Sequence, residues 1–212
     1  MSKGRLILTN IIGMIVVLAL IAGGSYYYYQ SANYVKTDEA KVAATMGQIV
    51  APTSGKLSGW TVEEGDDVTK DAQVGKVSDG KQTVGLSSSM EGKVIKKEAS
   101  DNQMVQAGQV LAQTADMNNL YITANIKEDK LKDIEKGDSV DVTVDGDSGT
   151  TFEGEVEEIG YATTSTFSVM PQQNTSGNYT KVTQKVPVKI SIKAPSDKVL
   201  PGMNAEVKIS TK

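Results

Sequence analysis

The chain resembles itself at an offset of 37 residues, and this repeat restricts the possible folds more than any other feature. Each copy consists of short apolar strands separated by glycine-centred and polar turns. Two such halves are expected to pair about a pseudo-twofold axis as one flattened β-sandwich, with chance similarity between β-rich segments as the alternative. The matched positions are Gly55-Lys56-Leu57 with Gly92-Lys93-Val94, Val62 with Ala99, Val68 with Val105, Val74 with Leu111, and Asp79 with Asp116.

The second half of the chain also has the alternation of apolar and polar residues that is typical of strands. Val140, Val142 and Val144 alternate with polar residues, and residues 182–192 alternate over a longer run. A period of two places one face in a core and the other in water. Pro187 cannot donate a ladder hydrogen bond, so its strand is expected at a sheet edge or with a bulge.

Composition excludes most kinds of catalytic and metal site. The chain contains no cysteine and no histidine, which rules out disulfides, zinc-thiolate sites and Ser-His-Asp triads. Outside the N-terminal segment, acidic residues outnumber basic ones by 26 to 20, which does not favour nucleic acid as a partner. We therefore assign no catalytic or metal residues.

Residues 6–24 are apolar apart from Thr9 and Asn10. Nineteen helical residues reach about 28 Å, close to the hydrocarbon thickness of a bilayer. Lys3 and Arg5 precede this run and residues 26–29 are all tyrosine, as at an interfacial aromatic belt. The pattern predicts a single-pass anchor in the cell membrane with a cytoplasmic N-terminus and the bulk of the chain outside. A cleaved signal peptide is the alternative.

Several segments resemble the hemolysin-D-type membrane fusion (periplasmic adaptor) proteins. Residues 51–57 and 62–68 resemble the signature of biotinyl/lipoyl-type domains, and residues 120–128 resemble the start of that family's β-barrel. Residues 167–188 closely resemble the segment of the branch that partners major-facilitator multidrug exporters. Residues 200–203 resemble the closing strand of the family.

This resemblance implies a mainly β fold with an N-terminal transmembrane helix, a lipoyl/biotinyl-like flattened β-sandwich, and a β-barrel domain with one short helix. The helix is expected over residues 127–135, with Gly137 just past its end. The expected domains are a cytoplasmic tip and anchor (1–30), a polar tether (31–39), the lipoyl-like domain (40–118) and the barrel (119–212), with a long loop at 163–181.

The chain departs from the family pattern between the two lipoyl halves. Gram-negative relatives carry a long α-helical hairpin there, whereas here residues 80–85 join the halves, and no heptad repeat occurs in the sequence. A short form of this kind cannot bridge a wide periplasm. It suits a single-membrane, Gram-positive-type bacterium, in which the adaptor faces a wall.

The loop at 163–181 is the expected functional segment, because long loops in compact β domains are often functional. The interpretation is a docking loop that seats apolar side chains against a transporter, with a flexible tip as the alternative. Its candidate residues are Phe167, Val169, Met170, Pro171, Asn174, Gly177, Asn178 and Tyr179.

Lys81 is a weak candidate for a different role. It lies where a biotin carrier has its modified lysine, but Gly80 and Gln82 flank it instead of the usual carrier motif. An exposed turn lysine is the simpler interpretation.

The resemblance implies an adaptor subunit of a multidrug or toxin efflux or secretion system, which is not an enzyme and has no cofactor. Its expected partner is a multi-span transporter, of the major facilitator type or alternatively of the ABC type, and self-association is also expected. Two other functions remain open at this point: a membrane-tethered biotinyl or lipoyl carrier subunit of an enzyme, and a wall-facing ligand-binding module.

Overall fold

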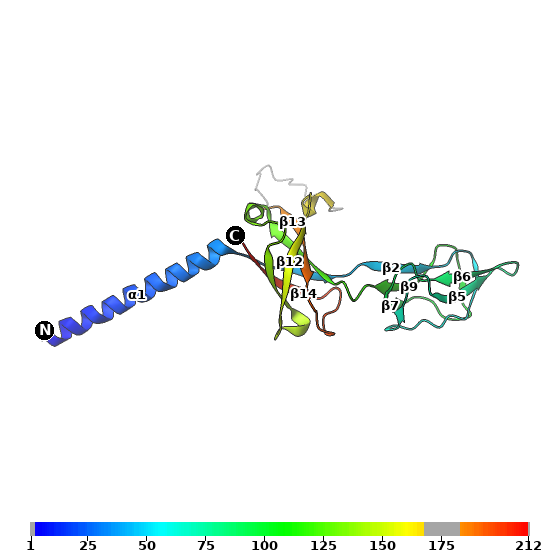
Figure 1. Cartoon of the computed structure of the whole chain (residues 1–212), viewed down its shortest axis with the longest axis horizontal. Helices are drawn as coiled ribbons and strands as arrows, with labels where there is room; N and C mark the ends of the chain where they lie inside the picture. Colours follow the sequence, from blue (N-terminus) through cyan, green and yellow to red (C-terminus); the bar gives the residue numbers. More distant parts are fainter. Residues whose placement is uncertain (1–2, 168–182, 212) are drawn as a thin grey trace, which may run out of the picture. The chain divides into compact units, whose positions relative to one another are not determined.

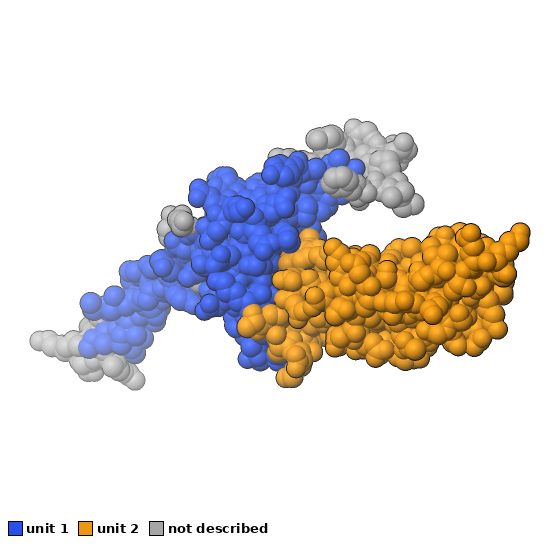
Figure 2. Space-filling view, turned by 45° about the vertical axis from the view of Figure 1, so that its right-hand side comes forward, with its two compact units in different colours: residues 1–40, 124–193, 205–212 blue, residues 41–123, 194–204 orange. Residues whose placement is uncertain are grey.

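The computed structural model describes residues 3–167 and 183–211 (Figure 1), and the side chains of residues 3–10, 27, 28, 30–32 and 167 lie outside the described set. Within this described part the chain forms two compact units (Figure 2). One unit comprises residues 1–40, 124–193 and 205–212, and the other comprises residues 41–123 and 194–204.

The N-terminal segment forms one long helix, α1 (Lys3–Asn33). A search limited to the described residues finds no helix long and apolar enough to cross a membrane. The expected anchor over residues 6–24 includes side chains outside the described set, so it stays a prediction.

Six strands close into a barrel, which confirms the expected barrel architecture. Their alternating side chains fill its interior, where Ile122, Val142, Val188, Ile190 and Ile209 are almost fully buried. In order around the barrel, the strands are β1 (Tyr34–Ala43), β10 (Tyr121–Lys127), β13 (Lys185–Ile192), β12 (Thr151–Ile159), β11 (Ser139–Val144) and β14 (Asn204–Ser210).

The barrel differs from the sequence-based expectations in three places. Most of the expected polar tether (31–39) belongs to strand β1, whose Val35 is buried. Pro187 is not at a sheet edge, because β13 lies between β10 and β12; the irregularity in register falls in β12, between Val156 and Glu158. The short helix is in the expected place, but it is a 3-10 helix, η1 (Glu128–Asp133). Two further 3-10 turns are η2 (Asp145–Asp147) and η3 (Thr164–Phe167).

The second unit contains the sandwich, and its strands follow the predicted repeat. One sheet has the order β2 (Met46–Val50), β9 (Val110–Ala115), β7 (Gly92–Lys97) and β4 (Asp67–Val68). The other has the order β6 (Thr83–Ser87), β5 (Gln73–Ser78), β3 (Gly55–Ser58) and β8 (Met104–Val105). The pairs β2/β6, β3/β7, β4/β8 and β5/β9 are each offset by 37 residues, so the duplicated sandwich is confirmed.

Each sheet combines strands from both halves. In the first sheet β4 of the first half pairs with β7 of the second, and in the other sheet β8 of the second half pairs with β3 of the first. The hydrogen bonds repeat as well: Val94 N–H donates to Asp66 O and Leu57 N–H donates to Gln103 O, both at 2.8 Å. One apolar cluster, which includes Trp60, fills the space between the sheets.

Two glycines at equivalent positions allow the strands to approach closely. A Cβ atom added to Gly55 would lie 2.3 Å from Ser78 O, and one added to Gly92 would lie 2.5 Å from Ala115 O. Because these neighbours are backbone atoms, they cannot move aside as a flexible side chain could.

We therefore expect Gly55→Ala and Gly92→Ala to lower the free energy of unfolding by about 1–3 kcal/mol each, through overpacking. Urea unfolding of the full chain, followed by the fluorescence of Trp60, the single tryptophan, measures this. Gly149→Ala is the control, because a Cβ there meets open space. Wild-type stability of both variants would contradict the expectation.

At Thr114 the two halves of the repeat differ in residue type at a buried position. Thr114 is fully buried, its hydroxyl has no hydrogen-bond partner among the described residues, and its counterpart in the first half is Val77. Valine has the same shape without the hydroxyl, and a buried unsatisfied hydroxyl costs about 1–3 kcal/mol.

Thr114→Val is therefore expected to raise the free energy of unfolding by about 1 kcal/mol or more, and Val77→Thr to lower it by a similar amount. The same urea titration measures both variants. No gain in stability from Thr114→Val would mean that water or a local shift satisfies the hydroxyl.

Candidate functional site

The turn between β5 and β6 is the first candidate site, because it contains Lys81. Asp79 Oδ1 accepts hydrogen bonds from the backbone N–H groups of Lys81 and Gln82, both at 2.7 Å. These bonds, the one from Gln82 first, hold the pKa of Asp79 below its ordinary value of 3.8. The turn spans residues 79–82, since residues 83–85 of the expected linker belong to β6.

The second half has the same turn at the equivalent position. Asp116 Oδ1 accepts from the N–H groups of Asn118, at 3.0 Å, and Asn119, at 3.2 Å. The exposed Lys81 thus lies in one of two matching Asp-closed turns, and the equivalent residue in the other turn is Asn118. This geometry gives the turn a structural explanation that requires no modified lysine.

The predicted docking loop lies largely outside the described residues. The backbone of Phe167 ends η3, whereas the Phe167 side chain and Val169, Met170, Pro171, Asn174, Gly177, Asn178 and Tyr179 are outside the described set. What the structure describes is where the loop begins and ends. Residues 160–167 follow β12 and residues 183–184 precede β13, so both ends of the loop emerge from one end of the barrel.

Hydrogen bonds fix both ends of this loop. Gly160 N–H donates to Pro187 O at 2.8 Å, Ser165 Oγ donates to Gln184 Oε1 at 2.5 Å, and Glu128 N–H donates to Gln184 O at 3.0 Å. A Cβ atom on Gly160 would lie 2.7 Å from Pro187 O, so this contact needs glycine.

Sequence reasoning missed Tyr161 at the start of the loop. Its side chain is 97% exposed and is therefore accessible to a partner. The signal in the sequence was a tyrosine directly after a glycine that ends a strand.

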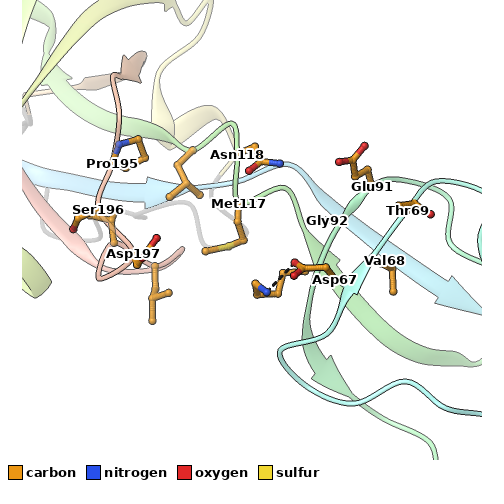
Figure 3. Close-up of a pocket in the computed structure, with 14 residues that line it drawn as sticks. Asp67, Val68, Thr69, Glu91, Gly92, Met117, Asn118, Pro195, Ser196 and Asp197 are labelled. Carbon is orange, nitrogen blue, oxygen red and sulfur yellow. Dashed lines mark ion pairs between the residues drawn. The ribbon is translucent and has the colours of Figure 1, made fainter.

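A groove of about 660 Å³ lies in the unit that contains the sandwich (Figure 3). Its walls include β4, the start of β7 and residues 195–200, which belong to the connection between β13 and β14. Lys93 Nζ lies 2.8 Å from Asp67 Oδ1, drawn as a dashed line, and 82% of the Asp67 side chain is exposed. An exposed ion pair of this kind contributes little energy.

No group of three or more metal-ligating acidic side chains occurs within the described ranges, 3–167 and 183–211. Of the predicted site residues, the structure therefore places Lys81 in an exposed turn and the backbone of Phe167 at one end of the docking loop.

Both units of the chain match known protein families. The profile of the YhbJ barrel-sandwich hybrid domain matches residues 45–116, and that of the AAEA-like beta-barrel domain matches residues 119–210. A protein of Bacillus subtilis (strain 168), YhbJ, whose name assigns it to an efflux system, is 68% identical over 210 residues, which cover 99% of this chain and 95% of YhbJ. The chain belongs to the membrane fusion protein family.

Other relatives match this membrane fusion protein over part of their own length or in fold alone. The multidrug resistance protein MdtN of Escherichia coli (strain K12) is 33% identical over 110 residues, which cover 50% of this chain but only 32% of MdtN. The solved structure of the membrane fusion protein Spr0693 from Streptococcus pneumoniae R6 has the same fold, with a TM-score of 0.58 and 14% identity over 84% of this chain and 99% of that one.

Family membership fixes the class of function. Membrane fusion proteins are non-enzymatic, membrane-associated adaptor components of efflux systems that work with transporters and oligomerise. We therefore expect the functional site of this chain to be a contact surface for another protein.

The lowered pKa of Asp79 gives a test of the turn between β5 and β6. Because the folded-state pKa lies below the ordinary value of 3.8, the contribution of Asp79 to stability is complete above that value and is lost as the pH falls through the folded-state pKa. The difference in unfolding free energy between wild type and Asp79→Asn should therefore be constant above about pH 5 and shrink below pH 4.

Urea titrations at a series of pH values measure this difference. Lys81→Ala is the control, since it leaves Asp79 and both amide donors in place, and its difference from wild type should not change over this pH range. A constant difference for Asp79→Asn would contradict the assignment.

Proposed function

We propose that this membrane fusion protein is the adaptor of a multidrug or toxin exporter and holds a multi-span transporter of the major facilitator type, with the ABC type as the alternative. The observation that carries the proposal is the docking-loop segment. It resembles the branch that partners major-facilitator exporters, and both of its ends are fixed by hydrogen bonds at one end of a closed barrel. MdtN, a multidrug resistance protein by name, supports the class of exported compound.

The N-terminal helix anchors the adaptor in the cell membrane through residues 6–24. Helix α1 has 31 residues, and Ile12, Met14 and Leu20 expose more than half of their apolar surface. Transfer of such side chains from water to hydrocarbon is favourable by about 25 cal/mol per Å² of apolar surface. Lys3 and Arg5 favour a cytoplasmic N-terminus, which leaves both β units on the outer side of the membrane.

The docking loop, residues 163–181, contacts the transporter. The strand that leads into the loop, β12, ends at the same end of the barrel at which β1 begins, and β1 follows α1, which suits this role. Tyr161, exposed at the start of the loop, adds an aromatic side chain of the kind enriched in protein interfaces.

The adaptor acts in a cell with one membrane. The two halves of the sandwich are joined by a four-residue turn, residues 79–82, where a helical hairpin would extend the molecule. A form with this turn suits a transporter that releases its substrate directly beyond the membrane.

Crosslinking in the native host, followed by purification in mild detergent, tests this function. A transporter with several membrane spans is expected to co-purify, and mass spectrometry identifies its class. Recovery of no such protein would overturn the proposal, as would a biotin adduct on Lys81 in the intact mass.

Replacing Phe167 and Met170 together by Asp is expected to lower the yield of co-purified transporter at least about tenfold, because charged side chains in an apolar contact cost more than 1.4 kcal/mol. The control is Ser148→Asp with Thr150→Asp, which adds the same charges in the turn between β11 and β12, at the other end of the barrel. Equal recovery with both double variants would show that the loop is not the docking element.

A further inference from the structure

The duplicated sandwich has two equivalent grooves, one in each half of the repeat. One has a volume of about 570 Å³, and its lining includes Gly55 and Lys56. The other is the groove of about 660 Å³ drawn in Figure 3, and its lining includes their counterparts, Gly92 and Lys93. Because the repeat forms both hollows, the concave shape itself belongs to the fold. We name the groove of Figure 3 the acidic groove.

The residues that differ between the two grooves distinguish the acidic one. Both halves have the same backbone at these positions, and in the other half the same positions are neutral or lack a side chain. The fold of the repeat therefore requires neither the carboxylates nor the methionine of the acidic groove. The differences are Glu91 in place of Ser54, Asp67 in place of Met104, and Met117 in place of Gly80.

The second wall of the acidic groove has no counterpart in the other groove, and it is fixed to its own unit. It consists of residues 195–200. Val42 N–H donates to Met203 O at 2.9 Å and Gly202 N–H donates to Val42 O at 2.8 Å, just beyond this wall. Val199 within the wall is 1% exposed. Both walls are thus held in place without a ligand, as is usual for small-molecule sites.

The charged side chains that line the acidic groove leave an excess of negative charge. Lys93 pairs with Asp67, so these two charges cancel. Glu91 and Asp197 are both exposed, and neither has a hydrogen-bond or ion-pair partner in the part of the chain that the structure describes. Lys198, the next residue, is not part of the lining and takes part in another interaction. Two carboxylates therefore remain available to a ligand.

Apolar side chains complete the acidic groove. In Figure 3, Asp197 lies on one side, Glu91 on the other, and Met117 between them. Leu120 and Val199 also contribute to the lining. The volume is within the range of small-molecule sites, about 300–1,000 Å³. A methionine side chain adapts its shape to different apolar groups.

A metal ion does not fit this arrangement. Within residues 3–167 and 183–211, no three acidic side chains are close enough together to hold a metal ion. The unpaired carboxylates come from opposite walls with an apolar side chain between them. A ligand that reaches both walls is therefore larger than an ion, carries positive charge and has apolar surface.

We propose that the acidic groove binds an organic cation with a large apolar body. Glu91 and Asp197 attract the charge from the two walls, and Met117 contacts the apolar body. This deepens the proposed function, on which it rests for the source of the ligand, since a drug released by an exporter supplies such a cation. Binding itself requires only the adaptor.

Equilibrium dialysis of the full chain against tetraphenylphosphonium tests the proposal. A non-ionic detergent at equal concentration on both sides of the membrane cancels uptake of the probe by micelles. Saturable binding to the wild type is expected. Triphenylphosphine oxide, which lacks the charge, and tetramethylammonium, which lacks the apolar body, should each bind at least about tenfold more weakly. No saturable binding of tetraphenylphosphonium would overturn the proposal, as would equally tight binding of either analogue.

A double variant tests the two carboxylates. Glu91→Ser, which introduces the residue of the equivalent position, is combined with Asp197→Asn. The dissociation constant for tetraphenylphosphonium should rise about threefold for each lost charge and about tenfold for both. Urea unfolding, followed by Trp60 fluorescence, checks that the sandwich of this variant is intact.

The matched control is Asp141→Asn with Glu153→Ser, because these exposed residues lie opposite each other in the pairing of β11 with β12 and carry the same charges. This control should bind the probe as the wild type does. Equal losses in both double variants would show that only the net charge matters and would overturn the proposal. Displacement of the probe by an equal concentration of calcium would also overturn it, because it would show a metal-ion site.

Transporter recovery separates this proposal from the proposed function. If the wild type fails to bind tetraphenylphosphonium while a multi-span transporter still co-purifies with it, this proposal is wrong and the proposed function stands. If the groove binds the probe as described but no transporter is recovered, the site holds and the proposed function is wrong.

Discussion

The exchange of short strands between the two halves of the sandwich is the interaction on which the folding of this unit depends. Strand β4 pairs Asp67 with Lys93 and Val68 with Gly92, and strand β8 pairs Gly55 with Val105 in the same way. Neither half can complete a sheet or cover its apolar side chains alone. Because every core residue of the cluster depends on both halves, the sandwich is expected to unfold as one cooperative unit.

The exchange also explains which parts of the sandwich the sequence predicted. Glycine at positions 55 and 92 was visible as a repeat because both copies need the same close approach of strands. Other equivalent positions share a conformation but not a residue: φ is positive at Gly65 and Asn102, and again at Asp71 and Gly108. Asparagine and aspartate tolerate this region better than most residues, so the backbone repeat is more regular than the sequence shows.

The barrel was harder to predict because its closure depends on contacts between distant segments. Strand β1 looked like a tether because only Val35, Ala40 and Val42 of its ten residues are buried apolar ones. Its role becomes apparent only when β10 and β14, far along the chain, lie on either side of it. The prediction that Pro187 lies at a sheet edge was wrong for the same reason, since a closed barrel has no edge. The barrel tolerates Pro187, which lacks an N–H group, because this residue lies at the end of the ladder between β13 and β12. The docking loop rests on the resemblance alone, as its central residues lie outside the described set.

An adaptor without chemistry can act on a transporter only through a difference in binding. If it bound all conformations of its partner equally, it would shift none of them. A difference arises when the contact surface is stiff enough to fit one conformation. Hydrogen bonds at Gly160, Ser165 and Gln184 fix the two ends of the segment that the sequence predicts as a docking loop. Oligomerisation, which is a property of the family, would add to the effect, because linked copies raise the effective concentration of each predicted docking loop at its partner.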